Sequence, residues 1–116
     1  MAPVIAAFKA QKERFKLRVV STGQHQEMLT PILDSFALKV DHYLQLMRPG
    51  LDLPTMTATM LEAMTRELKK HPPQLLLVQG DTTTVFSAAL AAFYAQVPIG
   101  HVEAGLRTHD LYNPFP

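Results

Sequence analysis

The sequence contains no cysteine, which excludes disulfide bonds and thiolate metal ligands and leaves the redox compartment open. No apolar run approaches the ~18 residues that a membrane-spanning helix needs, so we do not expect a membrane partner. Because the first residues lack a signal-peptide pattern, we expect a cytoplasmic protein. The formal net charge is +1, which gives no electrostatic reason to expect nucleic acid as a partner.

The common phosphate-loop and hydrolase motifs are missing as well. The chain has no Walker loop, no G-x-G-x-x-G, no G-x-S-x-G and no H-E-x-x-H metal spacing. What is present is ordinary for a globular protein, since 47% of the residues are apolar and 18% are charged. With 116 residues, the chain is long enough for one modest domain with a core.

Helical and strand patterns alternate along the whole chain. The expected elements are a helix over residues 2–15, a strand over 17–21, a helix starting near Thr30, a weak edge strand over 41–47, a helix between Asp52 and Pro72, a buried strand over 75–78, a helix carrying Phe86, and a strand over 98–102. This alternation predicts an α/β fold with a Rossmann-like parallel sheet and helices on both faces.

Two of these helices have an apolar stripe. In the helix that Asp52 is expected to cap, the stripe is predicted to be plain core and comprises Leu53, Met56, Met60, Met64 and Leu68. In the last helix, Phe86, Leu90 and Phe93 fall at helical spacing and predict a bulky apolar face.

Asp81 and Glu103 each come just after one of the last two strands. The carboxyl ends of neighbouring parallel strands form the edge at which α/β sheets bind ligands. One right-handed crossover between the strands would let both carboxylates face a common cleft. A pair of carboxyl groups can divide proton transfer between them.

Each candidate also has a purely structural interpretation. Asp81 precedes three threonines and could cap the following helix. His101 could be a core histidine or a ligand, and Arg107 could bind a phosphate or carboxylate, or neutralise Glu103. Thr22, Gly23, Gln24 and His25 end another strand and could form a turn and helix cap or face the same cleft edge. Spacing alone therefore predicts an α/β domain with an acidic ligand cleft.

Several segments match a known family in order. They are residues 22–25 (Thr-Gly-Gln-His), 27–29, 47–50 (Met-Arg-Pro-Gly), 80–84 (Gly-Asp-Thr-Thr-Thr), 91–94, 100–108 (Gly-His-Val-Glu-Ala-Gly-Leu-Arg-Thr) and 112–116. In these segments the chain resembles the UDP-N-acetylglucosamine 2-epimerases of the non-hydrolysing bacterial type. The resemblance implies a GT-B fold, which has two Rossmann-like halves separated by a deep cleft.

By this resemblance, residues 1–116 form an incomplete N-terminal Rossmann-like domain. The family's first strand is expected before Met1, and its C-terminal domain is also expected to be absent from these residues. Without that first strand the sheet would have a gap at its centre. An inactive fragment that only binds a sugar nucleotide is therefore one alternative.

The resemblance implies an isomerase that interconverts UDP-N-acetylglucosamine and UDP-N-acetylmannosamine by eliminating and re-adding UDP. Asp81 and Glu103 match acids implicated in catalysis, and we expect them to act as acid and base without assigning which gives the proton. Asp81, Glu103, Arg107 and His101 are the expected substrate-binding residues, and the alternative role of His101 and Arg107 is to shape the loop or to support Glu103. No metal or redox cofactor is implied.

The family also suggests further properties and competing functions. Gln24 and His25 match a segment that binds an activating UDP-sugar in some members, although Gly50 stands where regulated members have arginine. The implied partner is a UDP-sugar, the implied assembly is a homodimer when full length, and the implied role is in cell-envelope polysaccharide biosynthesis. The competing enzymes are a hydrolysing relative that releases UDP and N-acetylmannosamine, and a GT-B glycosyltransferase.

Overall fold

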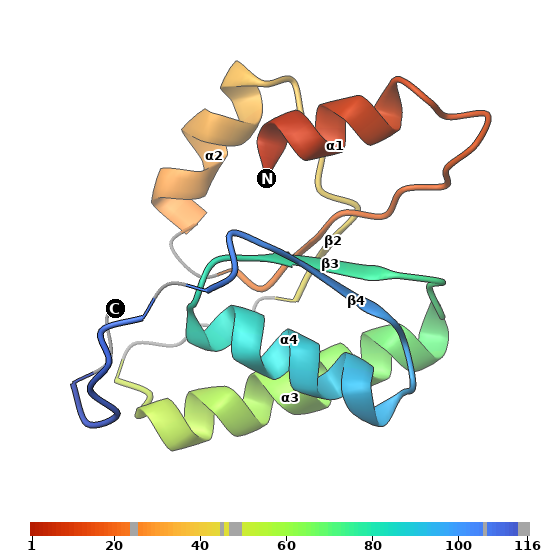
Figure 1. The fold of residues 1–116 in the computed structure, drawn as a ribbon. Helices are drawn as coiled ribbons and strands as arrows, with labels where there is room; N and C mark the ends of the chain where they lie inside the picture. The colour runs from red at the N-terminus through yellow and green to blue at the C-terminus, as the bar shows by residue number, and fades with distance from the viewer. Residues whose placement is uncertain (24–25, 45, 47–49, 106, 114–116) are drawn as a thin grey trace. The chain divides into compact units, whose positions relative to one another are not determined.

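The computed structural model describes residues 1–23, 26–44, 46, 50–105 and 107–113. The chain divides into two compact units, Met1–Pro49 and Gly50–Pro116. Helices and strands alternate from α1 to β4 (Figure 1) in the order that the sequence predicts. The strands pair in parallel, which confirms the predicted α/β class.

The first unit contains α1 (Ala2–Lys9), β1 (Val20–Ser21), α2 (Gln26–Ser35) and β2 (His42–Tyr43). β1 and β2 pair in parallel, with Val20 opposite His42 and Ser21 opposite Tyr43. Asp41 extends this pairing, because its carboxylate accepts a hydrogen bond from the Val19 N–H at 2.7 Å while its own N–H donates to the Val19 carbonyl at 2.8 Å.

Both helices of the first unit differ from the sequence prediction at their ends. α1 stops at Lys9 instead of reaching residue 15, and residues 10–14 form turns that bring the Phe15 ring to 4.8 Å from the Phe8 ring. α2 begins at Gln26 and includes Pro31, which removes only one helical hydrogen bond. Ser35 strengthens its last turn by donating a side-chain hydrogen bond to the Pro31 carbonyl at 2.7 Å.

The second unit contains α3 (Leu53–Lys70), β3 (Leu76–Gln79), α4 (Thr83–Tyr94) and β4 (Ile99–Val102). The Asp52 carboxylate caps α3, as predicted, by accepting a hydrogen bond from the Thr55 N–H at 2.8 Å. α4 packs against α3 and contacts both strands. The core of this unit therefore lies between the two helices and under the sheet (Figure 1).

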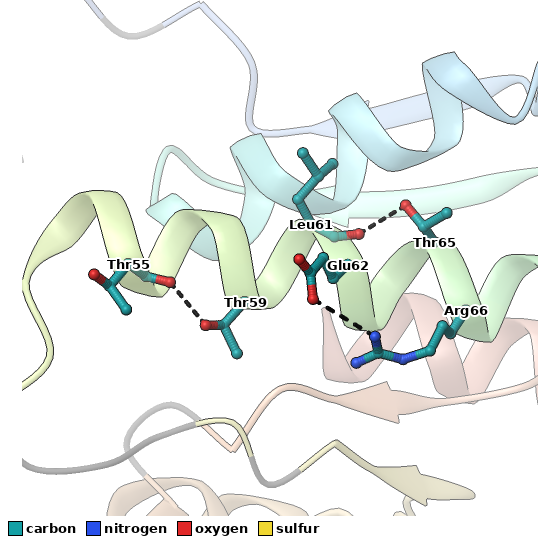
Figure 2. A network of polar contacts seen from close by, with 6 residues as sticks. All are labelled: Thr55, Thr59, Leu61, Glu62, Thr65 and Arg66. Carbon is teal, nitrogen blue, oxygen red and sulfur yellow. Dashed lines mark hydrogen bonds and ion pairs between the residues drawn. The ribbon is translucent and has the colours of Figure 1, made fainter.

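The predicted methionine stripe of α3 is part of this core. The buried residues of α3 are Met56, Met60, Ala63, Met64, Glu67 and Leu68, whereas Leu53 is exposed in the first turn. The threonines of α3 form hydrogen bonds within the helix, as Figure 2 shows for Thr59 and Thr65. The same view shows the ion pair between Glu62 and Arg66, whose charged atoms lie 3.6 Å apart. Because both side chains are exposed, the pair adds little stability.

The predicted bulky face of α4 is not its buried face. The buried residues of α4 are Val85, Ser87, Ala88, Ala91 and Ala92, whereas Phe86 and Phe93 are 59% and 70% exposed. The small side chains let α4 approach α3 closely, so the long methionines of α3 fill the space between the helices. The hydroxyl of Thr84 also contacts the Met60 sulfur at 3.7 Å. The large buried side chains therefore come from α3, and the small side chains that allow close packing come from α4.

Among the described strands, β1 pairs with β2 in the first unit, and β3 pairs with β4 in the second. β3 is less enclosed than its apolar sequence predicts, because Val78 is the only residue of the strand that is buried, and Leu75, just before the strand, is 47% exposed. A gap at the centre of the sheet, expected from the family resemblance, stays a prediction. Among the described helices, none is both long and apolar enough to cross a lipid bilayer.

Candidate active site

The carboxyl ends of β3 and β4 lie at the same edge of their sheet. Gln79 and Val102, the last residues of the two strands, are paired, and the Gly80 N–H donates to the Val102 carbonyl at 3.1 Å. Asp81 follows two residues after the end of β3, and Glu103 follows directly after β4. The parallel register therefore brings both candidate acids to one edge, as the spacing predicts.

Asp81 stands in the turn between β3 and α4. Gly80 has a φ of +87°, which a residue without a Cβ adopts at little cost, and this allows the chain to leave the strand sharply. The N-cap of α4 is Thr82, without a side-chain capping bond, so the alternative role of Asp81 as helix cap does not apply. Asp81 is exposed and bonds to no residue in the described ranges, so its carboxylate can receive a ligand.

Glu103 adopts a backbone conformation that is unusual for its residue type. Its φ is +61°, in the left-handed region, where a non-glycine residue is strained by about 1–2 kcal/mol. Its carboxylate oxygen Oε2 accepts a hydrogen bond from the Gln79 side-chain amide at 3.0 Å. Strained backbone persists where the surrounding structure holds it, and such residues concentrate at functional sites.

His101 reaches from β4 to the turn that carries Asp81. Its ring nitrogen Nε2 lies 2.6 Å from the Gly80 carbonyl oxygen. Because a carbonyl only accepts hydrogen bonds, Nε2 must carry the proton and donate it. His101 is exposed, so it is not the core histidine that the sequence also allowed. It steadies the Gly80–Asp81 turn from the neighbouring strand.

The remaining candidates are less well defined by the structure. Arg107 is exposed on the segment after β4. Gln24 and His25 lie outside the described residues, as does Arg48. Within the ranges that are described, no three acidic or histidine side chains are grouped as a metal site would require.

Gln79 is the residue of this edge that the sequence prediction missed. Its signal was present, because it is a polar residue at the end of the apolar run formed by residues 75–78. A strand-terminal polar side chain beside a predicted acid can only be recognised as its partner once the strand register is known. The register places Gln79 opposite Val102, one residue before Glu103.

The fold and this edge together define a class, the parallel α/β proteins that present acidic side chains at the carboxyl ends of neighbouring strands. Comparison with known proteins narrows the class. The family model described as UDP-N-acetylglucosamine 2-epimerase matches residues 7–116. The chain belongs to the UDP-N-acetylglucosamine 2-epimerase family.

Individual relatives of this family are similar to the chain over its whole length. A UDP-N-acetylglucosamine 2-epimerase of Yersinia pestis is 49% identical over 100% of this chain and 31% of its own length. A crystal structure of a UDP-N-acetylglucosamine 2-epimerase superposes with a TM-score of 0.92 at 43% identity, again covering 100% of this chain and 31% of the other.

A structure of the Neisseria meningitidis enzyme, described as bound to UDP-GlcNAc, superposes with a TM-score of 0.91 at 44% identity and the same coverage. The match is to the N-terminal domain of these structures. The chain thus spans about a third of the length of the relatives that it matches.

Proposed function

We propose that this chain supplies the acid/base groups of an isomerase that interconverts UDP-N-acetylglucosamine and UDP-N-acetylmannosamine. The observation that carries the proposal is the placement of Asp81 and Glu103 at one edge of the β3–β4 sheet. Support comes from membership of the family and from the relative whose structure is described as bound to UDP-GlcNAc.

The chemistry requires two proton-transfer events at the sugar C2. That C–H is too weakly acidic for direct removal and return, so UDP leaves across C1–C2. One carboxylate takes the C2 proton as the C1–O bond breaks and the C1=C2 bond of 2-acetamidoglucal forms. A carboxylic acid then protonates C2 on the opposite face, and UDP re-forms the bond to C1. Asp81 and Glu103 are suited to these roles because one group must accept a proton and another must deliver it.

The departing pyrophosphate needs positive charge or oriented N–H groups. The N-terminus of α4 begins two residues after Asp81 and presents such N–H groups. We assign Arg107 and His101 to substrate binding at the same edge. Gln24 and His25 match the family segment that contacts a second UDP-sugar, but Gly50 replaces the arginine of the regulated members, so we do not propose control by an effector. These assignments rest on the family motifs that the residues match.

We further propose that the chain is an incomplete N-terminal Rossmann-like domain of a GT-B protein that acts as a cytoplasmic homodimer in the synthesis of cell-envelope polysaccharide. The support is the match of the whole chain to about a third of each relative. Because the chain matches only about a third of each relative, each experiment is designed for a full-length protein that contains it.

Proton NMR of UDP-N-acetylglucosamine in D2O tests the function directly. We expect the full-length protein to remove the sugar H2 signal and to produce UDP-N-acetylmannosamine, with the chain alone as the comparison. Free UDP and N-acetylmannosamine would instead assign the hydrolysing reaction, which the names of the relatives do not favour. Retention of H2 by the full-length protein would contradict the proposed function.

A further inference from the structure

The contact between Gln79 and Glu103 joins a strand end to a candidate catalytic group. Gln79 ends β3 and is half-buried, so its backbone is fixed by pairing with β4. Its side-chain amide donates to Glu103 Oε2 at 3.0 Å across a sequence separation of 24 residues.

The backbone geometry of Glu103 is what makes the contact possible. In a continued strand, Glu103 would point to the opposite face from Val102, the residue paired with Gln79. Its φ of +61° ends the strand and redirects the side chain, so that its carboxylate meets the Gln79 amide. The strained turn and the cross-strand hydrogen bond thus act on the same side chain.

A neutral amide is suited to holding an acid/base carboxylate. It donates a hydrogen bond without titrating, so it does not compete for the transferred proton. It is bonded to Oε2, so this hydrogen bond does not use the second carboxylate oxygen, Oε1. Holding an otherwise exposed glutamate in one orientation also removes side-chain freedom that would have to be lost during the reaction.

We propose that Gln79 is a positioning residue that orients the Glu103 carboxylate for proton transfer. This inference rests on the proposed function, in which Glu103 is one of the two acid/base groups. The hydrogen bond from His101 to the Gly80 carbonyl plays the matching part for the turn that carries Asp81. Two side chains, one from each strand, therefore keep the two candidate acids in register.

The first test is the substitution Gln79→Met in a full-length protein. Methionine keeps the length of the side chain and removes the amide. We expect kcat to fall on the order of 10- to 100-fold, because small misplacements of reacting groups cost this much, while KM changes little. Gln74→Met is the matched control, since Gln74 is exposed just before β3, and it should leave kcat unchanged.

The second test repeats Gln79→Met in a Glu103→Gln background. If Gln79 acts through Glu103, Gln79→Met should lower kcat by less than roughly 2-fold once the Glu103 carboxylate is gone. An equal loss in both backgrounds would show that Gln79 acts elsewhere and would overturn the inference. Full turnover by Glu103→Gln alone would overturn the proposed role of Glu103, which is a distinguishable result.

Folding is monitored by thermal unfolding of every variant. If Gln79→Met does not fold, Gln79→Asn replaces it, because asparagine keeps the polar amide but is one methylene too short to make the same bond. The same fall in kcat at unchanged KM is expected. A folded Gln79→Asn or Gln79→Met protein with wild-type kcat would overturn the inference.

Discussion

The α3–α4 interface and the carboxyl-terminal edge of β3 and β4 belong to the same unit but differ in how far their side chains are buried. In the interface, Met60 and Ala91 have no exposed surface and the helices pack closely. At the edge, Asp81 and Glu103 are exposed, and the backbone of Glu103 is strained. We expect the packed interface to supply stability and the exposed edge to supply the proposed chemistry, so substitutions in the two regions should have separable effects.

The largest expected effect is on turnover, from Asp81→Asn or Glu103→Gln in a full-length protein. Each substitution keeps the shape of an exposed side chain and removes a proposed acid/base group, so we expect a loss of about 10²- to 10⁴-fold in turnover. The NMR assay of epimerisation measures it, and circular dichroism should show normal folding. Wild-type rates for both variants would contradict the acid/base assignment and would show that the proposed chemistry does not take place at this edge.

Met60→Ala tests the other region. Met60 is fully buried, and its truncation should lower the free energy of unfolding by about 2–5 kcal/mol because a cavity remains between the helices. Chemical denaturation measures the change. Phe93→Ala is the control, since Phe93 is 70% exposed and its loss should cost only about 0.5 kcal/mol. Equal costs would mean that the bulky face of α4 is also covered.

Ser87→Ala should strengthen the interface. The Ser87 hydroxyl is fully buried and has no hydrogen-bond partner within the described residues. Removing an unsatisfied buried hydroxyl from a helix should raise the free energy of unfolding by about 1 kcal/mol. Ser35→Ala is the matched control, because the Ser35 hydroxyl is bonded to the Pro31 carbonyl and should give no such gain. A destabilised Ser87→Ala protein would show that the hydroxyl has a partner.

Glu103→Gly separates strain from chemistry at the edge. Glycine accepts a positive φ, so relief of strain should offset the added flexibility and the lost hydrogen bond, with a net change below about 1 kcal/mol in the free energy of unfolding. Turnover should nevertheless be lost with the carboxylate. Gln96→Gly, at a φ of +57°, should relieve similar strain without loss of turnover. A large destabilisation by Glu103→Gly would assign Glu103 a structural role.

The smallest effect is expected at the exposed end of α3. Hydrogen bonds from the Thr55 side chain and from the Thr55 N–H hold the pKa of Asp52 below its ordinary value of 3.8. The stabilisation is therefore present above pH 3.8 and is lost as the pH falls through the lowered pKa of the folded state. Asp52→Ala should lower the melting temperature slightly at neutral pH, and the difference from wild type should shrink in acid. A constant difference would contradict a charge-dependent cap.

Local patterns predicted most of the second unit and failed where two elements meet. The cap at Asp52, the methionine stripe of α3 and the strand alternation follow from residues near each other in the chain. The sequence of α4 did not predict which of its faces is buried, because Phe86 and Phe93 make the exposed face the more hydrophobic one. Only packing against the methionines of α3 selects the small face. The candidate site shows the same limit, since Gln79 and Glu103 are 24 residues apart.

The sequence by itself determined the alternating α/β order, the family, and the placement of Asp81 and Glu103 after consecutive parallel strands, because hydrophobic periodicity and short motifs are local properties. The tertiary structure alone decided which face of α4 is buried, that Thr82 and not Asp81 occupies the N-cap position of α4, and that Gln79 is hydrogen-bonded to Glu103. These depend on strand register and on helix contact, which bring distant residues together and are set by the fold as a whole.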